Sequence, residues 1–467
     1  MREKLQQKTK AGLDMTVGNP FKLLIVYAFP ILLGSLFQQL YNMCDTIIVG
    51  RFLGPDALAA VGNTGPMNFL VFGFLYGMTS GFAVITSQRY GAHDEEGVKN
   101  SVAMNIVLNL VTGIVITVIA CAVTMPLLRL INTPESILKG SFDYIFTIYA
   151  GILSIVLYNA CTCVLRAVGD SKTPLYFLVF AALLNILLDI VFIASFGMGI
   201  FGAALATVLS NLVAGILSLI WIVIKYPILH VQKRHFAVST RFMQSHLFLG
   251  MNMGFQFSIT AIGTIFVEGA LNMFGDTKIA AVTAAMKVEQ LVTVAAGVMG
   301  VTIANYAGQN LGAARIDRIK QGVTQSVIVS TAFAVLAAVL AWSFNTQLIE
   351  LFLDKNKVDA GKLQEILSAA RTYLKLTVVF YPVLFLIFIY RNVLQGIGRG
   401  FWPLMGGVFE LVARSVAAVA LPPFIGYSGI CIAEPLAWAS AAIPLGIAYY
   451  IIIRKVEAIA SEPALAR

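Results

Sequence analysis

Long apolar segments recur along almost the whole chain and are separated by short polar segments. Each exceeds the roughly 20 residues that an α-helix needs to cross about 30 Å of hydrocarbon. The pattern predicts an all-α, polytopic membrane protein. Its twelve predicted transmembrane helices lie near residues 22–50, 57–86, 101–124, 141–164, 174–195, 200–224, 246–273, 278–305, 321–345, 368–394, 403–424 and 429–453.

The composition supports a chain that is embedded in a lipid bilayer. Hydrophobic residues make up 58% of its 467 residues and charged residues 12%, about half the charged share of a soluble protein. The net charge of +9 alone would allow a nucleic-acid partner. However, the basic residues are spread over alternate loops, as the positive-inside bias requires, so we expect no nucleic-acid binding.

The basic residues also orient the chain. An even number of helices places both termini on one side, and lysine and arginine are more than twice as numerous on that side as on the other. This bias predicts that both termini are cytoplasmic. The loop after the ninth predicted helix is an exception, because it carries Lys355, Lys357 and Lys362 on the outer side.

The chain contains an internal repeat. At an offset of 221 residues, Gly54, Ala59, Ala60 and Val61 match Gly275, Ala280, Ala281 and Val282, and Gln88, Gly91 and Ala92 match Gln309, Gly312 and Ala313. At an offset of 229, Leu165, Gly169 and Pro174 match Leu394, Gly398 and Pro403. Six helices per half make the repeats parallel. We expect an N-terminal lobe at 1–225, a cytoplasmic linker at 226–246 and a C-terminal lobe at 247–467, around a central cleft. This plan favours a transporter.

Acidic side chains inside predicted helices are functional candidates, because ionisable groups in hydrocarbon are costly. Asp45, Asp189 and Thr207 each lie about 8–10 Å below the outer surface, at about 1.5 Å per residue. Asn185 precedes Asp189 by one helical turn and shares its face. These oxygen ligands suit a small cation, and two nearby carboxylates also favour a shared proton. A hydrogen-bonded network that only holds the helices together is an equal alternative.

Proline in the first predicted helix provides a candidate hinge. Pro30 lies 15 residues before Asp45, and proline removes a backbone hydrogen bond and bends a helix. The helix could therefore move when Asp45 changes charge. A static kink explains the same residue equally well.

The second half does not repeat the carboxylates. At the offset of 229, Asn185 corresponds to Arg414 and Asp189 to Ala418; at 221, Asp45 corresponds to Phe266.

The charges of the second half therefore have to be placed separately. Glu410 and Arg414, four residues apart, predict an ion pair within one helix. Lys287 and Arg414 are the only basic residues expected to be buried in the membrane. Glu289 is a candidate contact for a cationic substrate, whereas Glu268 and Glu434 are expected to lie shallower, where water can reach them.

The sequence resembles multidrug and toxic compound extrusion (MATE) transporters, in particular the bacterial DinF-type and MepA-like members. The resemblance extends over essentially the whole chain. It rests on an ordered set of segments: Pro30 to Gly54 with Gln-Gln-Leu-Tyr-Asn-Met-Cys-Asp at 38–45, Leu-Arg-Ala-Val-Gly-Asp at 165–170, Asn185 with Asp189, and Gly-Ala-Ala-Leu-Ala-Thr at 202–207.

The resemblance implies export of small organic, often cationic compounds in exchange for H⁺ or Na⁺. It assigns the cation site to Asp45, Asn185, Asp189 and Thr207, and the bend to Pro30. Candidate substrate contacts are Gln38, Tyr41, Asn42, Gln256, Glu268 and Glu289. It further implies a monomer in the bacterial inner membrane, with no cofactor besides the coupling ion.

Two other functions stay open. A flippase for lipid-linked precursors has the same two-lobe plan, but its cleft would be expected to carry several basic residues. A polytopic membrane enzyme would need a catalytic motif, and the sequence contains neither a His-rich run nor Gly-x-Ser-x-Gly. The five cysteines lie in predicted helices, and the four histidines lie in predicted loops or at a helix edge. We therefore expect neither a disulfide framework nor a zinc site.

Overall fold

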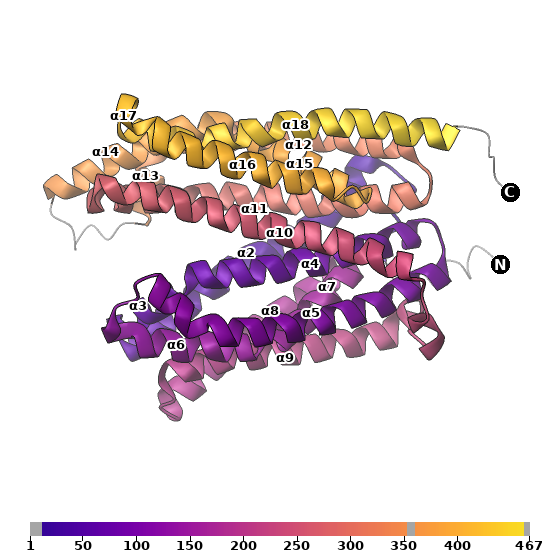
Figure 1. Cartoon of the computed structure of the whole chain (residues 1–467), viewed down its shortest axis with the longest axis horizontal. Helices are drawn as coiled ribbons and strands as arrows, with labels where there is room; N and C mark the ends of the chain where they lie inside the picture. The colour runs from indigo at the N-terminus through magenta and orange to yellow at the C-terminus, as the bar shows by residue number, and fades with distance from the viewer. Residues whose placement is uncertain (1–11, 353–359, 462–467) are drawn as a thin grey trace. The chain divides into compact units, whose positions relative to one another are not determined.

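The chain folds into long helices that are apolar enough to cross a membrane (Figure 1). The computed structural model describes residues 12–352 and 360–461; Lys355 and Lys357 of the exceptional outer loop lie outside them. In this described part, eleven helices qualify as spans, and α6 (Glu135–Ala150) with α7 (Ile152–Ala167), bent by 49°, forms a twelfth. The predicted all-α, twelve-helix architecture is confirmed.

Two compact units make up the described chain. The first unit comprises the residues up to Gly18, Ile25–Ser258 and Gly308–Ala313; the second comprises Asn19–Leu24, Ile259–Ala307 and the residues from Ala314 onward. The predicted lobe boundaries at residues 225 and 247 stay a prediction.

The first unit contains most of the first repeat and the beginning of the second. Besides α6 and α7 it includes α2 (Pro20–Leu53) from Ile25 onward, α3 (Pro55–Asn63), α4 (Gly65–Gly91), α5 (Glu95–Leu130), α8 (Lys172–Asp189), η1 (Ile190–Ser195), α9 (Gly199–Lys225), η2 (Pro227–Leu229), η3 (Lys233–Phe236) and the first part of α10 (Thr240–Leu271). A buried apolar cluster that includes Val49, Leu128 and Tyr149 forms its core.

The second unit contains the remaining helices. They are the rest of α10, η4 (Asn272–Phe274), α11 (Asp276–Gly312), α12 (Ile316–Ser343), α13 (Asn345–Glu350), α14 (Ala360–Thr377), η5 (Val378–Phe380), α15 (Tyr381–Gly396), α16 (Phe401–Ala420), α17 (Pro422–Ile425) and α18 (Tyr427–Ser461). The end of α11 belongs to the first unit.

Backbone conformation repeats together with the sequence. Gly54 and Gly275, which correspond at the offset of 221, have φ angles of 87° and 79°. His93 and Ala314, which also correspond at this offset, both have a φ of 55°. Residues other than glycine rarely adopt positive φ. A shared left-handed residue at the same place in both halves therefore shows that the two repeats turn in the same way.

Large apolar side chains on the helix surfaces indicate whether these surfaces face water or lipid. Val118 and Leu183 are each 64% exposed, and Val416 is 59% exposed. In water, contiguous apolar surface of this kind is unfavourable. A lipid bilayer removes that cost, so the exposed side chains fit a protein whose helices face hydrocarbon.

Candidate functional site

A carboxylate, an amide and a hydroxyl meet where α8 packs against α9 in the first unit. Asn185 and Asp189 lie on the last turns of α8, and Thr207 lies on α9. Asn185 and Asp189 are fully buried, and Thr207 is half-buried. The structure thus brings these three predicted ligands together inside one lobe.

The Asn185 amide connects the two helices. In the orientation that satisfies both neighbours, its Nδ2 donates to Asp189 Oδ2 at 2.8 Å and its Oδ1 accepts from the Thr207 backbone N–H at 3.1 Å. A neutral amide in this place fixes the Asp189 carboxylate without cancelling its charge. The negative charge stays available to an ion.

Asp45 brings a second carboxyl group to the same place from α2. Its carboxyl group lies within hydrogen-bonding reach of that of Asp189. The Oδ1 atoms of both residues are buried and accept no hydrogen bond from residues 12–352 or 360–461. Two negative charges at this separation repel each other in a medium of low polarity. The pair is therefore stable only when it shares a proton or binds a cation.

Two tyrosines complete the surroundings of the carboxyl groups. The Tyr41 hydroxyl lies near Thr207 and near both Asp45 and Asp189. Tyr144 of α6 is 8% exposed and lies near the same two carboxyl groups. Tyr41 was predicted as a substrate contact, and the structure places it in this cluster. Tyr144 was not predicted, because only tertiary packing brings α6 to the site.

The backbone changes its winding directly after Asp189. Residues Ile190–Ser195 form the π-helical turn η1. Such turns are rare and often occur at functional sites. The change in winding begins at the residue that follows the buried carboxylate, where a bound ion would act.

Pro30 lies between the anchored beginning of α2 and the part of the helix that carries Asp45. The helix runs from Pro20 to Leu53 with Pro30 inside it. One turn before the proline, the Tyr27 hydroxyl donates to the Arg166 carbonyl at the end of α7, at 2.7 Å. The segment that carries Asp45 follows the proline. Bending at Pro30 would therefore move Asp45 relative to a fixed beginning.

The remaining predicted substrate contacts do not form one cluster. Gln38 and Asn42 are exposed and lie one turn apart on α2, so they share a face. On α10, Gln256 is buried and Glu268 is exposed. Glu289 on α11 is 9% exposed and accepts a hydrogen bond from the Tyr373 hydroxyl at 3.2 Å.

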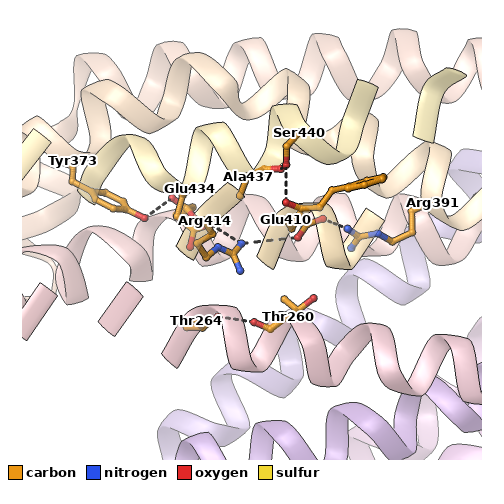
Figure 2. Close-up of polar contacts among 11 residues, drawn as sticks. Thr260, Thr264, Tyr373, Arg391, Glu410, Arg414, Glu434, Ala437 and Ser440 are labelled. Carbon is orange, nitrogen blue, oxygen red and sulfur yellow. Dashed lines mark hydrogen bonds and ion pairs between the residues drawn. The ribbon is translucent and has the colours of Figure 1, made fainter. Parts of the chain in front are cut away.

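The second unit contains a buried ionic network that Figure 2 shows as a row of side chains. Glu410 on α16 accepts a hydrogen bond from Arg391 on α15. Arg414 Nη2 lies 2.8 Å from Glu434 Oε2 on α18 and 4.0 Å from Glu410 Oε2. The four charges cancel in pairs, whereas the hydrogen bond of Glu289 is to an uncharged phenol. Among these three carboxylates, Glu289 is therefore the one whose negative charge a bound cation would best compensate.

Three expectations about buried charge were wrong. Lys287 is exposed, not buried. Glu434 is 9% exposed and pairs with Arg414, so it is not exposed to water. Arg391 is buried as well. Glu410 and Arg414 do contact each other, but each has a closer partner on another helix. The sequence reveals neighbours within one helix, whereas these partners on different helices meet through tertiary packing. The position of the charged Arg391 within an apolar segment was the sequence feature that could have indicated its burial.

Comparison with known proteins adds independent information. The MatE family profile matches residues 30–191 and 249–419. The chain is 31% identical over 422 residues to the "Probable multidrug resistance protein YpnP" of Bacillus subtilis (strain 168), covering 89% of this chain and 92% of that protein. It is 28% identical over 393 residues to the "Probable multidrug resistance protein YoeA" of the same organism, covering 83% of each.

Solved structures agree with the fold. The chain superposes on a MOP superfamily transporter from Pyrococcus furiosus with a TM-score of 0.89, covering 96% of this chain and 99% of that one. The two sequences are 24% identical, so the similarity supports a common fold.

Proposed function

Because this chain belongs to the MatE family, we propose that it is a secondary active antiporter that exports small organic, often cationic compounds in exchange for H⁺ or Na⁺. Its relatives in Bacillus subtilis carry the name of probable multidrug resistance proteins, which supports drug-like cargo. The observation that carries the ion-coupling part is the proximity of the half-buried carboxyl group of Asp45 to the buried one of Asp189.

Ion binding acts on this pair through repulsion. With a shared proton or Na⁺, the two carboxyl groups stay together; without it, they are forced apart. Asp189 is held by Asn185, so Asp45 is the group that moves. Because Tyr27 anchors α2 before Pro30, the displacement bends the helix at Pro30. The ion thereby selects between two conformations of α2.

Substrate binding uses the second lobe. Glu289 offers a buried carboxylate to the cationic group of the exported compound, and Tyr373 orients it. Gln38 and Asn42 provide exposed polar groups on α2, the helix that the coupling ion moves. Ion and substrate then compete for conformations of one helix rather than for one set of ligands, which suffices for antiport.

A flippase for lipid-linked precursors fits less well. Its anionic cargo would need uncompensated basic side chains. In the second unit, Arg391 and Arg414 are paired with Glu410 and Glu434. A membrane enzyme is also less well supported, because the relatives are transporters. We further propose a monomer in the bacterial inner membrane with both termini in the cytoplasm, as the basic residues indicate.

Dye efflux from proteoliposomes tests the proposal. A pH gradient and a sodium gradient are imposed separately, so that the gradient that drives efflux identifies the ion. Asp45→Asn should leave the protein folded and abolish gradient-driven efflux, because the amide cannot share a proton or balance Na⁺. Asp56→Asn, the same change at an exposed position on α3, should transport normally. Full gradient-driven efflux by Asp45→Asn would refute the coupling role.

A further inference from the structure

The repeated Gln-x-x-Gly-Ala motif has no place in the proposed ion or substrate sites. In the first unit, its two copies lie against each other. A Cβ atom on Gly91 would overlap the backbone of Gln309, and a Cβ atom on Gly312 would overlap the backbone carbonyl of Gln88. The ends of α4 and α11 therefore touch backbone to backbone, and only glycine permits this approach.

The segment before α2 covers this crossing. The Leu13 N–H donates to the Gly169 carbonyl at 3.2 Å, just beyond the end of α7. The Met15 N–H donates to Gln309 Oε1 at 2.9 Å, and Asn310 Nδ2 donates to the Met15 carbonyl at 3.2 Å. We call residues 12–16 the latch segment.

Gln309 joins the latch segment to a second element. Its Oε1 accepts from Met15, and its Nε2 donates to the Ala167 carbonyl of α7 at 3.0 Å. Gln309, Asn310 and the Met15 side chain are all fully buried. Two amide side chains thus satisfy backbone groups of both α7 and the latch segment in a place that water does not reach.

We propose that residues 12–16 form a cytoplasmic latch that holds the end of α11 against the ends of α4 and α7, and that this latch must release before the protein opens toward the cytoplasm. The inference rests on the proposed transporter function, because only alternating access requires such an opening. The contacts named above are hydrogen bonds between the latch segment and the ends of helices, so they can break without unfolding a helix.

The latch segment leads directly into α2, which carries Pro30 and Asp45. Tyr27 holds the same end of α2 to the end of α7. The latch segment therefore adds a second attachment at the beginning of this helix, and bending at Pro30 moves Asp45 without moving Met15.

The test measures opening directly. Spin labels are placed at Glu95 and Asp317, which are exposed at the beginnings of α5 and α12, in the full chain with its five cysteines replaced. The distance distribution is recorded by double electron–electron resonance in nanodiscs. Gln309→Ala removes two hydrogen bonds and should raise the ratio of open to closed distances about tenfold or more.

Matched variants separate a latch from general destabilisation. Gln321→Ala, at an exposed position near the start of α12, should leave the distribution unchanged. Asn310→Ala removes one bond to Met15 and should raise the ratio about fivefold, so it serves if Gln309→Ala does not fold. A folded Gln309→Ala or Asn310→Ala with the distribution of the unsubstituted protein would overturn the latch. Absence of dye efflux would instead count against the proposed function, since the distance measurement needs no cargo.

Discussion

Replacing Glu410 by glutamine should destabilise the protein, because it leaves a buried guanidinium without its counter-ion. The side chains of Arg391 and Glu410 are 8% and 6% exposed. In Glu410→Gln, Arg391 loses the carboxylate that it contacts, whereas Arg414 keeps Glu434. The variant therefore isolates the effect of one uncompensated charge within the network of Figure 2.

The magnitude follows from burial. Removing one partner of a buried ion pair costs about 3–5 kcal/mol, whereas replacing both partners by uncharged groups is often nearly neutral. With an unfolding entropy of about 2 cal/mol/K per residue, 467 residues correspond to a shift of about 1 °C per kcal/mol. The single variant should therefore lose about 3–5 °C. The double variant Arg391→Met/Glu410→Gln, which leaves Arg414 paired with Glu434, should regain most of this loss.

The assay heats the purified protein in one detergent to a series of temperatures and measures the folded fraction that remains by size-exclusion chromatography. Glu457→Gln is the matched control, because Glu457 pairs with Lys320 at 2.5 Å with side chains that are 47% and 39% exposed. An exposed pair is worth about 0–1 kcal/mol, so this midpoint should move by less than about 1 °C. Equal midpoints for Glu410→Gln and the double variant would refute the reasoning, since charge balance predicts that they differ.

Two further substitutions test the site and the fold separately. Thr207→Val removes the hydroxyl but leaves the backbone N–H that donates to Asn185. We expect the driving-ion concentration for half-maximal efflux to rise about fivefold to tenfold. An unchanged value would exclude this hydroxyl from ion binding. Asp94→Ala removes the side chain that accepts a hydrogen bond from the Gly97 N–H, at 2.8 Å, at the start of α5. The free energy of unfolding should fall by about 1 kcal/mol, which lowers the unfolding midpoint by about 1 °C and leaves efflux unchanged. Reduced efflux would show that Asp94 has a role beyond capping the helix.

The sequence predicted the helices and the repeat because both are properties of the chain itself. Apolar segments longer than a bilayer is thick leave little alternative to helices. Local breaks were not visible in this pattern. The predicted helix at 57–86 is divided at Thr64 into α3 and α4, and the one at 368–394 contains the short turn η5. These breaks do not interrupt the apolar segments, so the hydrophobic pattern does not reveal them.

The number of residues between each site residue and the outer end of its helix predicted that Asp45, Asn185, Asp189 and Thr207 lie at a similar depth in the membrane, because the helical rise converts residue number into distance. It could not identify Tyr144, which reaches the same carboxyl groups from α6. Nor could it identify Arg391 as the partner of Glu410. Depth gives one coordinate, whereas contact requires the rotation of each helix and its neighbours as well.

The correspondence between Asn185 and Arg414 explains why one half alone would exchange an ion. Both residues occupy the same repeat position, on α8 and on α16. Each lies beside a carboxylate, Asp189 in the first unit and Glu434 in the second. In the second unit, the guanidinium of Arg414 is a cation that the chain itself supplies and cannot release. In the first unit, a neutral amide leaves the charge to be balanced from outside. On the proposed mechanism, coupling therefore resides where the repeat has an amide instead of an arginine.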